Sequence, residues 1–272
     1  METQNYARKF ELGLRFGGRQ SGGETSLLSY DMFRAGVAEF LGMAIFLFNV
    51  ISVARLVGNR DSMVNEPSSA IILISFSFGL SIFVLVYVLA GASGANLNPA
   101  ISTALLVGKR ITVERFIVYI ILQVLGAMAG AGIATIFLDS TDGGYNAIAD
   151  GIDVDDALAG EVLCTFLLVL TVFAATDGEL VNKHAFAGPL VPWVIGMAVL
   201  LSHLIMIPID GCSINPARSF ATAFTNNKWD DQWVFWIGPL LGGVLATVVW
   251  ETILRPDQLV EPQKPVVQAS TV

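Results

Sequence analysis

The chain has 272 residues, of which 54% are hydrophobic and only 14% are charged. Soluble domains carry about 25% charged residues, so this composition excludes an ordinary water-soluble protein and indicates a membrane protein. The net charge of −8 argues against nucleic acid as a partner, because binding to phosphates requires a basic surface.

The N-terminal residues 1–32 are polar and glycine-rich, and they lack the apolar core of a cleavable signal peptide. We therefore expect a cytoplasmic tail, followed by a first membrane helix that acts as its own insertion signal. A second cytoplasmic tail is expected at 257–272, which leaves 33–256 as the membrane domain. The two cysteines, Cys164 and Cys212, predict no disulfide framework.

Six stretches are apolar over about 20 residues each, the length that a helix needs to cross a bilayer. They lie at 35–57, 70–90, 115–138, 157–175, 189–207 and 233–254. Two further apolar segments, 98–107 and 215–224, are too short to span. The predicted fold class is therefore an all-α membrane protein with six transmembrane helices and two re-entrant half-helices.

Both short segments open with the triplet Asn-Pro-Ala. The residues are Asn98, Pro99 and Ala100 in the first copy and Asn215, Pro216 and Ala217 in the second, 117 positions later. Asn is a preferred N-cap and Pro suits the first helical position, so each triplet predicts a helix start. A single copy is also a common turn sequence, but two copies at matching places indicate a repeat.

The repeat extends beyond the triplets, since Glu39 in the first half (33–138) is matched by Glu161 in the second (157–254). Each half has three spans, an odd number, so the second half enters the membrane inverted. Glycine pairs four residues apart also recur in the last span of each half, and we expect them to pack helices closely. These pairs are Gly126/Gly130 and Gly238/Gly242.

Lys and Arg residues in short loops predict the orientation. With the N-terminus inside, eleven of them fall on the cytoplasmic side, and only Arg55, Arg60 and Lys228 fall outside. The connection 139–156 contains six Asp and neither Lys nor Arg, which is typical of an outer loop. Calcium binding is the alternative for these carboxylates, although they lack a recognisable ligand spacing. Both termini are thus predicted to be cytoplasmic.

Inverted halves would bring the starts of the two half-helices together near the midplane. Each helix start carries about half a positive charge, which disfavours a cation or hydronium there. A neutral molecule with an oxygen could instead accept hydrogen bonds from the amides of Asn98 and Asn215. The pattern favours passage of small neutral solutes and exclusion of ions.

Three charged residues are predicted to lie within the membrane. Arg218 follows the second triplet, and an arginine at this depth is functional by default when it faces a cavity. Snorkelling to the interface or structural pairing with Glu161 is the alternative. Glu39 and Glu161 are predicted to accept hydrogen bonds from N–H groups of the re-entrant loops, with a proton relay as the alternative role.

Two Asn-Pro-Ala boxes on a six-span inverted repeat, the second continuing as Arg218-Ser219-Phe220, resemble the aquaporin family. The resemblance covers 33–256. It implies one pore per subunit, water as permeant and a homotetramer in a lipid bilayer, in the plasma membrane or an intracellular vesicle membrane. No cofactor, metal or enzymatic activity is expected.

The resemblance assigns four positions of the family's narrowest point to this chain: Phe78, His203, Cys212 and Arg218. Arg218 and His203 would supply donors, Phe78 an apolar wall and Cys212 a backbone contribution and sensitivity to mercurials. Phe, His and Arg together resemble water-selective members, whereas glycerol-conducting members usually have Gly for His and Asp after Arg. The expectation is a passive channel that moves water in single file and excludes protons and ions.

Two features depart from many family members. Asn96 stands where many have His, which leaves the role of that histidine in doubt. The segment 177–188 is slightly longer than in many animal members and contains Lys183 and His184. Because this cytoplasmic loop closes the pore in some relatives, gating with proton sensing by His184 is a hypothesis.

Several other functions stay open from the sequence. One is a broader channel for glycerol, urea, ammonia or hydrogen peroxide, and another is a gated or closed channel. An ion-coupled transporter also uses inverted repeats, but it normally coordinates cations with helix C-termini and carboxylates. An adhesive membrane protein with a vestigial pore is disfavoured by the intact constriction.

Overall fold

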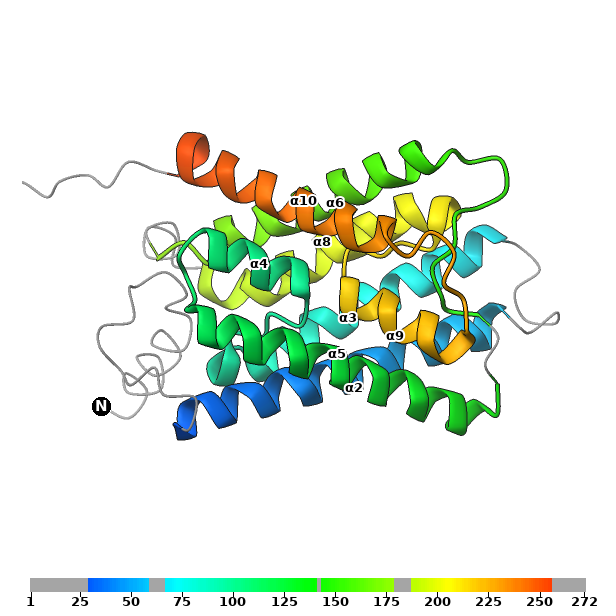
Figure 1. Ribbon diagram of the computed structural model, residues 1–272, viewed down its shortest axis with the longest axis horizontal. Coiled ribbons are helices and arrows are strands. Elements are labelled where there is room, and N and C mark those ends of the chain that lie inside the picture. The colour runs from blue at the N-terminus through cyan, green and yellow to red at the C-terminus, as the bar shows by residue number, and fades with distance from the viewer. Residues whose placement is uncertain (1–28, 59–66, 141–142, 179–186, 256–272) are drawn as a thin grey trace, which may run out of the picture.

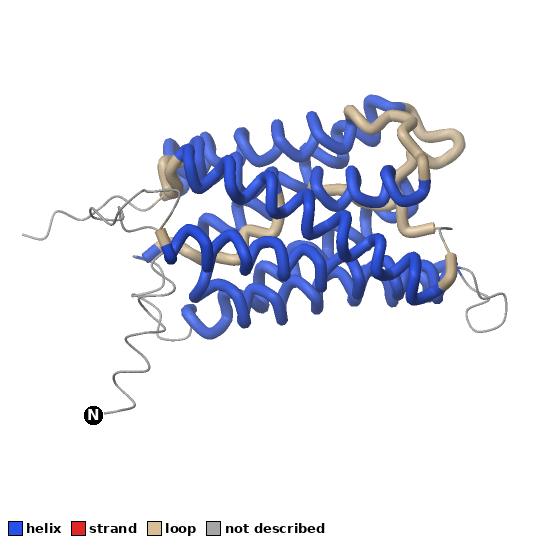
Figure 2. The backbone as a smooth tube through the Cα atoms, turned by 60° about the horizontal axis from the view of Figure 1, so that its bottom comes forward, coloured by secondary structure: helices blue, strands red, loops and turns tan. Residues whose placement is uncertain are grey.

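The computed structural model describes residues 29–58, 67–140, 143–178 and 187–255. These ranges form helices and loops without a strand, and the helices run along the length of one bundle (Figure 2). Within them, six helices are long and apolar enough to cross a membrane, which confirms the predicted class. The spans are α2 (Tyr30–Gly58), α3 (Pro67–Ser93), α5 (Val113–Leu138), α6 (Val154–Ala175), α8 (Ala187–Asp210) and α10 (Val234–Val249), which continues as the π-helical η1 (Trp250–Leu254).

The first five spans begin two to five residues before the predicted apolar stretches and end up to three residues after them, whereas the last span begins one residue later than predicted. Helix α2 begins at Tyr30, inside the segment 1–32 predicted as tail, where the Ser29 Oγ accepts a hydrogen bond from the Met32 N–H (3.2 Å). Such polar first turns are invisible to a hydropathy criterion, because their residues are not needed to cross the hydrocarbon layer.

The two half-helices are α4 (Pro99–Val107) and α9 (Pro216–Asn226). In Figure 1 they follow one another along the bundle, with α4 toward the end where α2 begins and α9 toward the opposite end. Each packs against the last span of the other half, α4 against α10 and α9 against α5.

The remaining helix contacts follow the same inverted symmetry. Helix α2 packs on α3 and α5, as α6 packs on α8 and α10, and α3 contacts α8 across the two halves. The first and last described helices, α2 and η1, have their outer ends at the same end of the bundle (Figure 1).

Glycines allow the closest of these helix contacts. A Cβ atom added at Gly126 would lie 2.2 Å from the carbonyl oxygen of Phe40, and one at Gly130 would lie 2.1 Å from that of Ala44. In the second half, a Cβ at Gly242 would lie 2.3 Å from the carbonyl oxygen of Val162. The predicted packing role of these glycine pairs is confirmed, since no side chain fits between the backbones.

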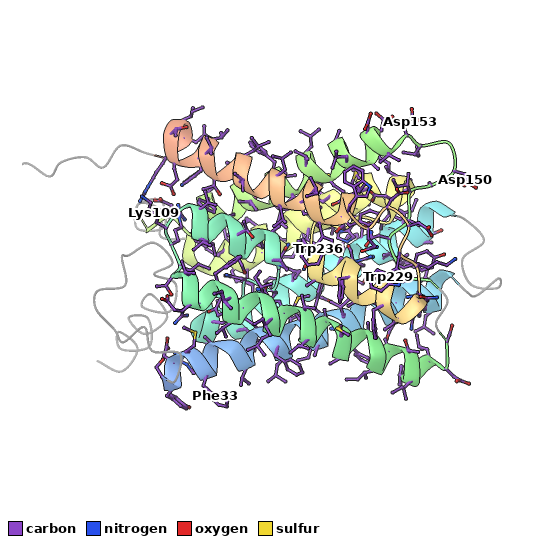
Figure 3. All side chains as sticks on the ribbon, viewed as in Figure 1. Phe33, Lys109, Asp150, Asp153, Trp229 and Trp236 are labelled. Atoms are coloured by element: carbon purple, nitrogen blue, oxygen red, sulfur yellow. The ribbon has the colours of Figure 1, made fainter. Side chains whose placement is uncertain are left out.

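Charged residues lie at the two ends of the bundle. Figure 3 shows Lys109 at the end where α2 begins, whereas Asp150 and Asp153 lie at the opposite end. Between the ends, large apolar side chains such as Ile121, Leu125 and Leu163 are exposed on the sides of the bundle. This is the surface that a lipid environment requires.

Candidate functional site

The site is built on the starts of α4 and α9. Asn98 and Asn215 have extended backbones and act as N-caps: the Asn98 Oδ1 accepts from the Ala100 N–H (2.8 Å) and the Asn215 Oδ1 from the Ala217 N–H (3.2 Å). Pro99 and Pro216 occupy the first helical position, where an N–H would lack a partner.

The two caps also brace each other across the repeat. The Asn98 Nδ2 donates to the carbonyl oxygen of Ile214 (2.7 Å), and the Asn215 Nδ2 donates to that of Leu97 (2.8 Å). A side-chain amide has two N–H groups, so each asparagine keeps a second donor. Both asparagines line the central cavity, where this second N–H is available to a permeating molecule.

A buried carboxylate supports the loop in front of each half-helix. Glu39 and Glu161 are 0% exposed, and each accepts hydrogen bonds from two consecutive backbone N–H groups. The donors are Asn96 (2.9 Å) and Leu97 (2.8 Å) for Glu39, and Ser213 (2.6 Å) and Ile214 (2.7 Å) for Glu161. These contacts satisfy N–H groups that would otherwise be unpaired at membrane depth.

The supported loops have an unusual backbone. Ala95, Leu97, Cys212 and Ile214 all have positive φ, between 42° and 56°, although none is a glycine. Left-handed backbone costs energy for such residues and persists only where the surroundings impose it. The carboxylate contacts and the asparagine braces supply that constraint, at equivalent positions of both halves.

A cavity runs past these loops through the centre of the bundle. Its wall is mostly apolar, with a few polar side chains and the two loop backbones exposed along it. The lining residues include Phe46, Ile82, Val86, Ile101, Leu168, Val172 and Ile195 on the apolar side, and Asn98, Asn215, His203 and Arg218 on the polar side.

Phe78 on α3, His203 on α8 and Arg218 on α9 meet at one place in this cavity. The Phe78 and His203 ring centroids lie 3.9 Å apart, and the Arg218 Cζ lies 5.3 Å from the Phe78 centroid. The His203 Nδ1 is 2.8 Å from the carbonyl oxygen of Val199, so in the neutral ring Nδ1 carries the hydrogen. With this tautomer the remaining Nε2 is an acceptor, which differs from the donor role expected of His203.

Arg218 is held by neutral groups. Its Nη1 donates to the Oδ1 of Asn146, and its Nη2 donates to the carbonyl oxygen of Gly211 (3.3 Å). Neither of these partners is Glu161, so the structural pairing with that carboxylate is not the arrangement seen in the described residues. Arg218 also lines the cavity, and its Nε is buried without a protein partner in that part of the chain.

The comparisons with known proteins agree on one family. The model of the major intrinsic protein (MIP) family matches residues 26–250. Probable aquaporin PIP1-2 of Oryza sativa subsp. japonica is 41% identical over 236 residues, which are 84% of this chain and 81% of the relative. Aquaporin PIP2-7 of Arabidopsis thaliana is 40% identical over 240 residues, 86% and 85% of the two chains. The chain belongs to the major intrinsic protein family, that of the aquaporins.

A solved structure supports the same fold. The X-ray structure of the aquaglyceroporin from Plasmodium falciparum matches with a TM-score of 0.71 over 83% of this chain and 98% of that chain. Sequence identity is 21%, so this likeness bears on the fold alone. As an aquaporin-family member, the chain is a multi-pass membrane channel for water or small solutes and not an enzyme.

The structure brings together most, but not all, of the expected site residues of this aquaporin-family chain. Cys212 is 0% exposed and is not among the residues that line the cavity, so its contribution to the constriction stays a prediction. His184 lies outside the described residues.

Asn146 was missed by the sequence analysis, which treated its loop only as acidic. The residue is buried, and its Oδ1 also accepts from the Ser219 Oγ (2.8 Å), while its Nδ2 donates to the carbonyl oxygen of Asp210 (3.1 Å). A single Asn after Gly143-Gly144 predicts a turn, and nothing local in the sequence distinguishes it from one.

Proposed function

We propose that this aquaporin-family member is a water-selective channel that conducts water in single file and excludes glycerol, ions and protons. The observation that carries the proposal is the meeting of Phe78, His203 and Arg218 in the cavity. The two rings lie within van der Waals range of each other and form one side of the opening, opposite the Arg218 guanidinium. We expect this opening to admit one water molecule and not a carbon chain.

The polar groups at this point match the needs of water. Arg218 donates and the His203 Nε2 accepts, so a passing water can replace the hydrogen bonds that it leaves behind. Beyond the constriction, the second N–H groups of Asn98 and Asn215 orient the water oxygen toward the helix starts. The positive ends of α4 and α9 and the charge of Arg218 oppose cations and hydronium.

The proposal includes the setting of the channel. Both termini are cytoplasmic in this proposal, since Lys109 lies at the end of the bundle where α2 begins, whereas Asp150 and Asp153 of the acidic loop lie at the other end. Four chains form a homotetramer in the plasma membrane or an intracellular vesicle membrane, with one pore in each chain. One pore per chain is part of the proposal because the cavity lies inside the helix bundle, between the starts of α4 and α9.

The test is osmotic shrinkage of proteoliposomes, followed by light scattering in a stopped-flow instrument. An impermeant osmolyte measures water efflux, and glycerol as osmolyte measures solute entry through the slow return of volume. Fast water efflux without glycerol entry above that of bare lipid is expected. Equal entry of glycerol would favour the broader solute channel, and water efflux no faster than bare lipid would reject an open water channel.

A further inference from the structure

At one pair of equivalent positions in the repeat, the first half has a hydroxyl group and the second half has a carboxyl group. The spacing of 117 that relates the two asparagine motifs also relates Ser93 at the end of α3 to Asp210 at the end of α8. Ser93 Oγ donates to Glu39 Oε1 (2.6 Å) and accepts from the N–H of Ala95 (2.9 Å). Asp210 Oδ1 accepts from the N–H of Cys212 (2.8 Å), which is the equivalent of the second contact.

The first contact has no such simple equivalent. The 117-residue equivalence with Ser93, whose Oγ contacts Glu39, places the Asp210 carboxyl group beside that of Glu161. Two ionised carboxylates there would have no hydrogen to share. Asp210 is 1% exposed and Glu161 is 0% exposed, and within the described chain no donor reaches the Asp210 Oδ2. Two adjacent carboxyl groups in such a site cannot both be ionised without a large electrostatic cost.

The two supporting carboxylates also differ in how many donors they have. Glu39 accepts four hydrogen bonds, from Ser93 Oγ, two backbone N–H groups and the Gln123 Nε2 (2.8 Å). Glu161 accepts two among the described residues, both from the backbone. The position that matches Gln123 in the second half is Phe235, which has no donor. Glu161 therefore lacks the side-chain donors that stabilise Glu39.

We propose that Asp210 is a positioning residue that carries a proton and donates it in a hydrogen bond to Glu161, as the Ser93 Oγ donates to Glu39. One proton then satisfies the Asp210 Oδ2 and gives Glu161 a third donor. The pair as a whole bears a single negative charge, which leaves Arg218 with its neutral partners.

The proton supports the constriction through two short paths. Glu161 holds the N–H groups of the loop before α9, and the carbonyl oxygen of Asp210 binds Asn146, which in turn binds Arg218. The other titratable groups that surround the pair are Arg218 on α9, the thiols of Cys164 and Cys212, and, on the far side of Arg218, His203.

With this arrangement, water conduction should fall at alkaline pH, a consequence that rests on the proposed water channel. When the proton is lost, Asp210 and Glu161 repel each other and the loop that carries Arg218 loses its support. Water permeability should fall by about fivefold as the pH rises, because the loss of one net hydrogen bond should shift the loop from its supported to its unsupported form by a factor of this size. A fixed, uncharged donor at position 210 removes this dependence.

The first test is independent of conduction. Infrared spectra of the full chain in lipid, recorded from about pH 6 upward, should contain the C=O stretching band of a protonated carboxylic acid, which shifts in heavy water. The band should be absent in Asp210→Asn, whose amide can donate to Glu161 without titrating. Absence of the band in the unmodified chain, or its persistence unchanged in Asp210→Asn, would overturn the proposal even if water conduction is normal.

The second test is the pH profile of water permeability in proteoliposomes with the same buffer inside and outside. Asp210→Asn and Asp210→Ser should both conduct with a flat profile, and either variant suffices if the other does not fold. Ser93→Ala is the matched control, because it removes the donor in the other half and leaves Asp210 in place; it should keep the alkaline fall. An alkaline fall that survives in the Asp210 variants would refute the assignment.

Discussion

At the scale of single side chains, the proposed channel depends on His203 to keep the pore narrow. Replacing it with Ala removes a ring whose centroid lies 3.9 Å from that of Phe78, so the constriction should widen on one side. We expect glycerol permeability of His203→Ala proteoliposomes to rise by about tenfold or more, since added pocket space admits bulkier molecules by factors of this size.

The matched control for this variant is Ser202→Ala. The neighbouring Ser202 Oγ bonds to the carbonyl oxygen of Ala198 (2.9 Å), and Ser202 is not among the lining residues of the cavity. Its replacement should leave glycerol excluded. Unchanged glycerol flux in His203→Ala would show that the narrowest point lies elsewhere.

Asn146 positions Arg218 from the outer loop. In Asn146→Ala, Arg218 and Ser219 both lose a buried acceptor, and we expect the free energy of unfolding to fall by about 1–3 kcal/mol. Thermal unfolding in detergent, monitored by tryptophan fluorescence, measures this loss. Asp150→Ala, an exposed change in the same loop, should have an effect within about 0.5 kcal/mol. Equal stability of the two variants would contradict the positioning role.

The role of a single side chain could be predicted from the sequence where the residue belongs to a repeated motif. The N-cap asparagines could be predicted because Asn-Pro at a helix start has a single local explanation. By contrast, the tautomer of His203 depends on the carbonyl oxygen of Val199, and the role of Asn146 depends on a loop 72 positions from Arg218. Long-range partners of this kind leave no local pattern.

Close approach of backbones holds the helices together at the element scale. In Gly130→Ala the added methyl group would overlap the carbonyl oxygen of Ala44, so α2 and α5 must move apart. We expect a loss of about 1–3 kcal/mol in stability, typical of overpacking. The control is Gly132→Ala in the same helix, where the added methyl group meets nothing within 4 Å. A similar melting temperature for both variants would mean that the interface is not tightly packed.

An ionic contact ties α4 to the end of the last span. The Arg110 guanidinium pairs with Glu251 (3.0 Å) and lies 3.9 Å from the centroid of the Phe173 ring. Burial lowers the pKa of Arg110 and the Glu251 carboxylate opposes this effect, so the arginine stays charged at neutral pH and needs its partner.

Removal of the Glu251 carboxylate should lower the stability of the fold by a measurable amount. Glu251→Gln leaves a mostly buried guanidinium without its ionised acceptor, and we expect a loss of about 1.5–3 kcal/mol in thermal unfolding. Arg34→Gln breaks an exposed pair with Asp31 and should cost less than about 1 kcal/mol. An equal loss in both would indicate that Arg110 is solvated in the folded protein.

Helix number and kind could be predicted because apolar runs of membrane length have few alternative structures. The limits of the helices could not, since first turns such as that after Ser29 depend on capping contacts rather than on hydropathy. The pairing of α4 with α10 and of α9 with α5 follows only from the inverted arrangement of the whole chain.

For the whole molecule, orientation in the membrane is the property to test. Lys109 and Asp150 lie at opposite ends of the bundle (Figure 3). In intact cells, an impermeant maleimide should label Asp150→Cys from outside and should label Lys109→Cys only after permeabilisation. The two native cysteines are buried and provide a low background. Labelling of Lys109→Cys in intact cells would contradict the predicted topology.

The mutual bracing of the two asparagine motifs has a consequence for the order of biosynthesis. The carbonyl oxygen of Leu97 is made with the first half, but its donor, Asn215, is translated more than a hundred residues later. Until then, a left-handed loop at membrane depth lacks one of its hydrogen bonds, which the bilayer core cannot replace. The first half must therefore wait in an unfinished form, and the pore closes around both motifs only when α9 has entered the membrane.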